Sequence, residues 1–186
     1  MKNSSLIAPQ EIDLFAGLKR PKLSAMEAKI PNLEFINPFI LGAVEALQVQ
    51  AGLKVEGGKP FMKGKQAQPE FVVAGVLGIV SNEFKGSIAL YFEKGPFLKI
   101  IENMLGETLT EVTDEYADAS AELLNITYGS AKTKLNQLGF DLKRALPTVI
   151  RGVGISSQVN SSAPAIVIPL RSEFGQVHIE ITVDPS

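Results

Sequence analysis

The stretch DEYADASAELLNITYGSAKTKLNQL, residues 114–138, decides the fold. Apolar side chains recur in it every three or four residues, the spacing that brings them to one face of an α-helix. The stretch therefore predicts one long helix packed against a core, around which the other elements are arranged. The residues of this apolar face are Ala117, Ala121, Leu124, Tyr128, Ala131, Leu135 and Leu138.

A second face of the same helix is polar and carries Asp118, Glu122, Asn125 and Lys132. Residues three apart on a helix are displaced by about 60° and one turn, so the carboxylate of Glu122 and the carboxamide of Asn125 project side by side. Exposed polar residues usually serve only solubility, and the helix dipole alone explains acids near the N-terminus such as Asp118. Within this face the adjacent Glu122 and Asn125 are the candidate functional pair and Asp118 is secondary, and a wider pattern is needed to decide between function and simple exposure.

Composition excludes several classes of function. The chain of 186 residues is 45% hydrophobic, enough for one substantial core with an additional arm. Its net charge of -2 provides no basic surface for nucleic acid or for a membrane. The chain has no Cys and only one His, so thiolate chemistry and the usual zinc sites are not expected. Alternation in VHIEI places His178 with Glu180 opposite the apolar residues, which predicts an ordinary solvated strand residue.

The N-terminus has no apolar stretch typical of a signal peptide, and the longest apolar run, residues 71–80, is too short to span a membrane. A cytoplasmic protein that does not enter the membrane is therefore expected. Residues 1–33 contain three prolines and short apolar clusters. They predict a partly ordered arm laid over the domain, or alternatively a docking peptide. Residues 34–186 are expected to form the single domain.

The order of predicted elements gives the fold class. Asn37 and Pro38 are typical of the cap and first position of a helix, and Gly95-Pro96 opens another that Gly106 closes. Apolar alternation with β-branched and aromatic residues indicates two hairpins. We predict an α+β fold, with two long helices packed on an antiparallel sheet. The expected elements are a helix at 39–50, a short strand with a Gly-rich turn within 53–62, a hairpin at 70–93, a helix at 95–105, the helix at 114–138, a strand at 140–150 and a hairpin at 163–183.

This order repeats, which predicts an internal pseudo-twofold relation between residues of about 35–95 and 114–184. A shift of 87 places Gly42 on Gly129, Gly52 on Gly139 and Pro60 on Pro147. In this register Glu122 falls opposite Phe35 and Asn125 falls opposite Pro38. The first half is then expected to have lost the polar pair, leaving one active face per chain.

The second half reads Asp118-x3-Glu122-x2-Asn125-x21-Pro147. This pattern resembles the CheC/CheX/FliY family of chemotaxis phosphatases, in which Asp or Ser, then Glu, Asn and a distant Pro occur at this spacing. Gly129, Lys132 and the sequence MLGE at 104–107 extend the resemblance, which covers residues of about 37–183. A single intact pair makes the chain most similar to the CheX branch, because CheC-type members usually carry the motif in both halves.

The resemblance implies a phosphatase that hydrolyses the aspartyl phosphate of the response regulator CheY. It further implies that Asn125 orients the attacking water and that Glu122 pairs with the regulator's active-site Lys, while Asp118 and Pro147 support the motif. No cofactor or metal of the chain's own is implied, since Mg²⁺ is expected on the regulator, and a homodimer is expected. Two alternatives remain: a non-catalytic CheC/FliY-like module that binds the regulator, and a scaffold that recruits another signalling protein through residues 1–33.

Overall fold

The structure is a computed structural model that describes residues 33–64, 69–82, 84–143, 145–155 and 165–185. The predicted arm, apart from residue 33, and residues 156–164, with the start of the second predicted hairpin, lie outside these described residues. The elements in chain order are α1 (Leu33–Glu45), the π-helical turn η2 (Ala46–Gln50), β1 (Glu56–Gly57), β2 (Phe61–Met62), β3 (Phe71–Val80), β4 (Phe84–Glu93), α2 (Lys94–Leu105), α3 (Asp114–Gln137), β5 (Thr148–Ile155), β6 (Ile166–Ser172) and β7 (Gly175–Pro185).

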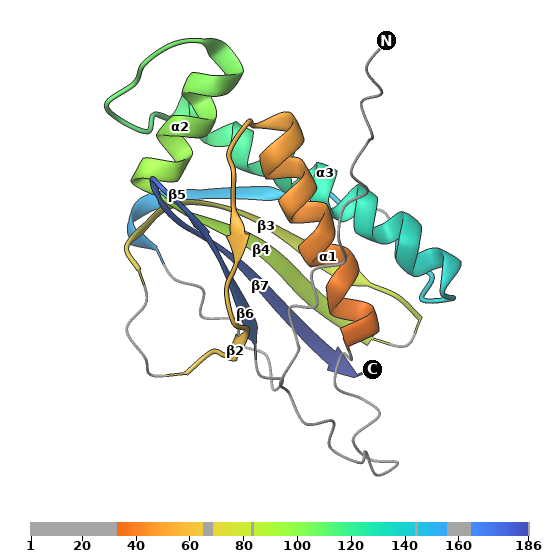
Figure 1. Ribbon diagram of the computed structural model, residues 1–186. Coiled ribbons are helices and arrows are strands. Elements are labelled where there is room, and N and C mark those ends of the chain that lie inside the picture. Colours follow the sequence, from red (N-terminus) through yellow and green to blue (C-terminus); the bar gives the residue numbers. More distant parts are fainter. Residues whose placement is uncertain (1–32, 65–68, 83, 144, 156–164, 186) are drawn as a thin grey trace, which may run out of the picture.

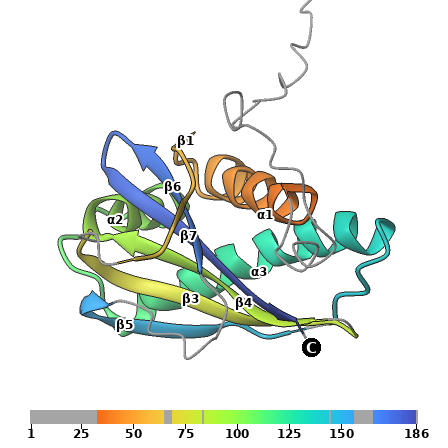
Figure 2. The ribbon, with the colours of Figure 1, turned by 90° about the horizontal axis from the view of Figure 1, so that it is seen from below.

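The described elements form two layers. Strands β1 to β7 make one antiparallel sheet, and α1 and α3 lie together on one of its faces, running in opposite directions (Figures 1 and 2). The main core lies between these layers and is built from the apolar faces of both helices and the helix-facing residues of β3, β4, β6 and β7. The predicted α+β architecture is confirmed, including both hairpins.

The strand order shows that the two halves are interlocked. The order is β1-β6-β7-β4-β3-β5, with β2 also pairing with β6. Along the path β2-β6-β7-β4-β3-β5, exchanging each strand for its counterpart in the other half (β2 with β5, β3 with β6, β4 with β7) gives the same order in reverse. The short strand of each half therefore pairs with the hairpin of the other half, and a pseudo-twofold axis passes between the adjacent strands β4 and β7.

The buried faces of α1 and α3 determine how the two helices correspond. At a shift of 88 residues, no buried residue of 34–45 falls on an exposed residue of α3. The predicted shift of 87 is wrong within the helices, because it superposes buried Phe35 on exposed Glu122. Glu122 instead corresponds to Glu34, and Asn125 to Asn37. The buried pairs at this shift are Phe35 with Leu123, Ile36 with Leu124, Phe39 with Thr127, Ile40 with Tyr128, Ala43 with Ala131 and Leu47 with Leu135.

The turn η2 accounts for the one-residue difference. Gly52 and Gly139 follow the two helices in left-handed conformations, with φ of 60° and 91°, and these glycines are 87 positions apart. In η2 the Ala51 amide donates to the Ala46 carbonyl at 3.2 Å, a bond that spans five residues. Such a turn holds about one residue more than an α-helical turn. It therefore absorbs one additional residue between α1 and its terminal glycine, which returns the following segment to the shift of 87.

Helix α1 begins at Leu33, earlier than the predicted start at residue 39, and Pro38 lies inside the helix. Burial explains the extension, because Phe35 and Ile36 are only 2% and 4% exposed and can be buried together only if the helix continues upstream. Phe35 packs edge-on against Phe84 and Phe140, with ring centroids 5.1 and 5.2 Å apart. The proline costs little here, since it removes one hydrogen bond close to the helix start.

The segment after α3 also differs from the prediction. The strand expected at 140–150 begins only at Thr148, because Asp141 has φ of 46°, outside the extended range. The Leu142 amide instead donates to the Asn136 side chain at 2.7 Å, and the Tyr128 hydroxyl donates to the Lys143 carbonyl at 2.6 Å. Leu138, predicted on the buried face, is 51% exposed because α3 ends at Gln137.

His178 is buried, so its prediction as a solvated strand residue is wrong. It lies on the sheet face opposite the helices, where its ring packs edge-on against Phe71 at 4.8 Å and Phe61 at 6.3 Å. His178 and Glu180 are 4% and 5% exposed, and Glu180 accepts an ion pair from Lys63 at 2.6 Å. Alternating apolar and polar residues indicate only that one face of a strand is buried. In β7 the segment around β2 also covers the opposite face, where His178 and Glu180 lie. Burial, with the nearby Lys63 charge, lowers the pKa of His178 to about 4.

The α1–α3 contact is testable at two glycines. A Cβ on Gly42 would lie 2.8 Å from the Thr127 carbonyl oxygen, whereas one on Gly129 would meet nothing within 4 Å. We expect Gly42→Ala to lower the free energy of unfolding by about 1–3 kcal/mol, because the helices must separate. The control Gly129→Ala should raise it by up to about 1 kcal/mol through helix propensity. Urea denaturation measures both, and an equal effect of the two substitutions would contradict this packing.

The buried histidine makes stability depend on pH. The folded pKa is about 4 and the ordinary value is 6.5, so the unfolded chain binds more protons between these values. The His178 contribution to stability is thus complete above pH 6.5 and is lost as the pH falls towards 4. Urea denaturation at pH 7.5 and pH 5 should show a smaller loss for His178→Gln than for the wild type. Equal losses would show that His178 is not held neutral by folding.

Candidate functional site

Helix α3 is held against the sheet on one side along most of its length. It comes close to β3 at Ser120, whose carbonyl oxygen would lie 2.6 Å from a Cβ on Gly75, so only glycine fits beneath it. Near the N-terminus of α3, the Asp114 carboxylate forms an ion pair with the Arg151 guanidinium of β5 at 2.5 Å. The helix is therefore a rigid support for the side chains on its other side.

Glu122 and Asn125 lie on that other side. Successive helical residues are rotated by about 100°, so Glu122 points about 200° and Asn125 about 140° away from Ser120, which faces the sheet. Both side chains are exposed, and neither makes a hydrogen bond or ion pair with another described residue. They follow each other by one turn, which keeps the carboxylate and the carboxamide on one surface. The structure thus presents both groups to a partner with their hydrogen-bonding capacity unused.

Asp118 is exposed one turn before Glu122 and extends the same surface. Pro147 directly precedes β5 and is partly buried, so it lies at the end of the connection from α3 to the sheet. Lys132 is half-buried, two turns beyond Asn125. The first three motif positions thus form a continuous surface on α3, and Pro147 belongs to the course of the chain behind it.

Tyr116 and Glu107 connect the MLGE sequence to the start of α3. The Tyr116 hydroxyl donates to the Glu107 carboxylate at 3.2 Å. This negative charge is the largest cause of a raised pKa of Tyr116, followed by burial. Glu107 therefore contacts the first turn of α3 and takes no part in the Glu122–Asn125 surface.

Outside the α3 surface, the described residues hold a surface cavity but no metal-binding cluster and no membrane-spanning helix. No group of three or more His, Cys, Asp or Glu side chains there could hold a metal ion. In the same part of the chain, no helix combines the length and apolar character needed to cross a membrane. A surface cavity of about 720 Å³ lies away from α3, lined by Gln48, Lys54, Val55, Glu56, Arg171, Ser172 and Glu173.

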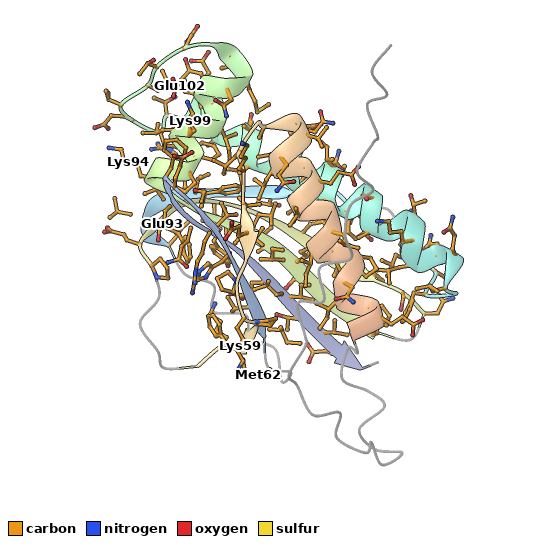
Figure 3. The ribbon with its side chains drawn as sticks, viewed as in Figure 1. Lys59, Met62, Glu93, Lys94, Lys99 and Glu102 are labelled. Atoms are coloured by element: carbon orange, nitrogen blue, oxygen red, sulfur yellow. The ribbon has the colours of Figure 1, made fainter. Side chains whose placement is uncertain are left out.

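Charged residues along α2 and at the end of β4 form structural contacts. Figure 3 shows Glu93 and Lys94 where β4 runs into α2, and Lys99 and Glu102 further along α2. Glu93 accepts from the Gln176 amide at 3.0 Å, and Lys99 pairs with Glu102 at 3.1 Å. The Lys99 ammonium also lies 5.5 Å from the Phe174 ring centroid. These contacts fix the β6–β7 turn onto α2.

Comparison with known proteins identifies the family. The family model described as "Chemotaxis phosphatase CheX" matches residues 73–171, which is more than half of the chain. The chain belongs to the CheX family. A CheX-family relative from Thermotoga maritima, named CheY-P phosphatase CheX, is 30% identical over 128 residues, covering 68% of this chain and 78% of that protein. The family-model match includes Glu122 and Asn125 and ends before β7.

Solved structures of the family share the fold. A CheC-like protein from Shewanella sp. PV-4 is 33% identical with a TM-score of 0.77, covering 82% of this chain and 99% of that chain. Chemotaxis protein CheX from Vibrio vulnificus is 32% identical with a TM-score of 0.76, covering 81% and 99%. A CheX from Borrelia burgdorferi, solved as a complex with CheY, BeF₃ and Mg²⁺, is 22% identical with a TM-score of 0.66, which shows the fold alone. The predicted resemblance to the CheC/CheX/FliY family, closest to CheX, is confirmed.

The alignment of the two halves of this sequence missed two residues of interest. At the helix register of the structure, Glu34 and Asn37 stand opposite Glu122 and Asn125. The signal for them was present in the sequence, because EFIN at 34–37 has the same Glu-x2-Asn spacing. The alignment of the two halves of the sequence missed this spacing, because its register was set by Gly52 and Gly139, which lie beyond the helices.

The exposed positions of the pair predict that replacing it leaves the fold intact. We expect Glu122→Ala and Asn125→Ala each to change the free energy of unfolding by less than about 0.5 kcal/mol, since neither side chain packs or pairs. The adjacent control Leu124→Ala should lower it by about 2–5 kcal/mol, because Leu124 is 0% exposed. Thermal and urea denaturation measure these effects. A large loss for Asn125→Ala would show that the residue is structural.

Proposed function

We propose that this CheX-family phosphatase hydrolyses the aspartyl phosphate of a CheY-type response regulator, with Asn125 and Glu122 as the residues that act on it. The observation that carries the proposal is the pair itself, fully presented on a rigid helix of a chain in this family. The substrate class follows from the relative named CheY-P phosphatase CheX and from the CheX solved with CheY.

The proposed reaction is attack of one water molecule on phosphorus. A new bond forms between the water oxygen and phosphorus while the bond from phosphorus to the aspartyl oxygen breaks, releasing inorganic phosphate and a free carboxylate. An acyl phosphate is already activated, so the main requirement is to hold the water in line with the breaking bond. The Asn125 carboxamide can both accept from and donate to that water without changing its charge.

Glu122 supplies the second contact. Its exposed carboxylate is one turn from Asn125 and can pair with a cation on the partner, such as the active-site Lys of a regulator. Such a pair would fix the position of the carboxamide relative to the phosphoryl group. Positioning of one water contributes on the order of 10²-fold in rate. The Mg²⁺ that such a reaction uses is proposed to belong to the regulator, and this chain is proposed to bring no cofactor of its own.

A catalytic function is better supported than a non-catalytic binding module. The relative at 30% identity is named as a phosphatase, and the Glu and Asn required by the motif are both present and unobstructed by other described residues. A scaffold acting through residues 1–33 would use a part of the chain that the structure does not describe. Domain bounds of 1–33 and 34–186 and a cytoplasmic location remain part of the proposal.

A homodimer also remains proposed. β5 lies at one edge of the described sheet, where it pairs with β3 alone, and the other edge is formed by β1 and β2. An edge strand provides unpaired backbone groups that a second copy of the chain can extend. Both edges meet this requirement, and each is a candidate for the dimer interface.

Release of phosphate from a phosphorylated CheY-type regulator tests the function. With the regulator well below saturation, we expect the wild type to accelerate release above the spontaneous rate and Glu122→Ala/Asn125→Ala to accelerate it less. The loss follows from removal of the water-positioning carboxamide and of its docking partner. Lys134→Ala/Gln137→Ala, an exposed pair with the same spacing near the end of α3, is the control and should act as the wild type.

Two results would contradict the proposal. No acceleration by the wild type would refute the activity. Acceleration that Glu122→Ala/Asn125→Ala leaves unchanged would refute the assignment of these residues. Saturable binding of the phosphorylated regulator without faster decay would favour the non-catalytic module.

A further inference from the structure

Helix α1 carries a glutamate and an asparagine at the same spacing as the pair on α3. We propose that Glu34 and Asn37 form a second water-positioning site, which acts on the same acyl phosphate as Glu122 and Asn125. This inference rests on the proposed function. It differs from the expectation of one active face per chain, because that expectation depended on the sequence register that the structure corrects.

The helix register is the first observation. At the shift of 88, exposed Glu34 corresponds to exposed Glu122, and half-exposed Asn37 to exposed Asn125. The residues that follow each glutamate, Phe35 and Leu123, are both buried against the sheet. The two pairs therefore project from equivalent sides of two equivalent helices. Glu34 and Asn37, like Glu122 and Asn125, point away from the core.

The helix crossing is the second observation. A Cβ on Gly42 would lie 3.4 Å from the Cβ of Ser130, so these residues meet where α1 and α3 cross. They are also 88 positions apart, which makes them counterparts and places the crossing on the pseudo-twofold axis. Asn37 and Asn125 each lie five residues before it. Because the helices run in opposite directions, the two asparagines are about 15 Å apart along the helix axes at about 1.5 Å per residue.

The distant proline is the third observation. Asn125 is followed after 21 residues by Pro147, and Asn37 is followed after 22 by Pro60. The one extra residue in the first half is the one that η2 holds. Pro60 lies between β1 and β2 and Pro147 directly before β5, and both are partly buried. All three positions of the Glu-x2-Asn…Pro pattern thus recur once the π-helical turn is taken into account.

The sites differ in their surroundings. The counterpart of Asp118 is Ile30, which lies outside the described residues. Glu34 is in the first turn of α1, where the helix dipole alone favours an acid. The dipole gives no account of Asn37, of the shared spacing or of Pro60. We expect the α1 site to be the slower of the two because it lacks the flanking carboxylate.

Geometry limits how the two sites are used. A single partner domain of typical size, about 100–150 residues, has a radius of gyration of about 13–15 Å. Two such domains cannot both dock head-on at points about 15 Å apart, so the sites are expected to act alternately on one bound regulator. The second site is therefore expected to raise the rate of phosphate release when the regulator is below saturation. It does not raise the number of regulators that bind to one chain.

Four variants test the second site by phosphate release from the regulator below saturation: Glu122→Ala/Asn125→Ala, Glu34→Ala/Asn37→Ala, the combination of all four, and Glu122→Ala/Asn125→Ala/Asn37→Ala. We expect the first to retain release at least several-fold above the spontaneous rate. The combined variant should show the spontaneous rate, and so should the triple variant, in which Asn37 alone is added. Glu45→Ala, an exposed acid on α1 away from the pair, is the matched control and should leave the rate unchanged.

The outcomes separate this inference from the proposed function. A wild type that does not accelerate release refutes the function. An active wild type, with Glu122→Ala/Asn125→Ala at the spontaneous rate and Glu34→Ala/Asn37→Ala at the wild-type rate, refutes only the second site. Binding of the regulator loaded with BeF₃ and Mg²⁺ gives an independent readout. Glu122→Ala/Asn125→Ala should still bind it saturably, and loss of that binding in the first variant, with a melting temperature unchanged, would overturn the inference.

Discussion

The contact of α1 with α3 at Gly42 and Thr127 sets the position of everything on the outer surface of the two helices. No side chain separates the backbones there, since a Cβ on Gly42 would lie 2.8 Å from the Thr127 carbonyl oxygen. Close approach brings Phe39 onto Tyr128, with ring centroids 6.4 Å apart, and directs the polar residues of both helices away from the sheet. A surface that must match the active site of another protein depends on such a fixed distance, because small displacements of a positioning group cost much of its effect.

The interlocked sheet explains why the halves hold this geometry together. Each half places its short strand beside the hairpin of the other half, so neither can complete its sheet alone. The halves share one core, to which both helices and both hairpins contribute. The pseudo-twofold symmetry also determines which positions of the first half correspond to those of the second. A position on α1 has the same relation to the axis as its counterpart on α3, whatever residue now occupies it.

Much of the fold could be predicted because its patterns are local. The three-to-four spacing in residues 114–138 and the alternation in the two hairpins each depend on a short window, and the structure confirms them. The exposure of Glu122 and Asn125 follows from the same spacing. Tertiary contacts decided the rest. Packing of Phe35 extended α1 past Pro38, the segment around β2 buried His178, and η2 shifted the helix register by one residue, which concealed the correspondence of Glu34 and Asn37.

The π-helical turn η2 shows how a chain of this kind can accept an inserted residue. An insertion within a helix normally rotates everything beyond it by about 100° and would turn a buried face outwards. Here the inserted residue is confined to the last turn, after Ala43 and before Gly52, so both the outer surface of α1 and the strands that follow keep their orientation. The first half has therefore gained a residue without turning the buried face of α1 outwards, which shows how duplicated units can diverge in sequence register while their buried faces still correspond.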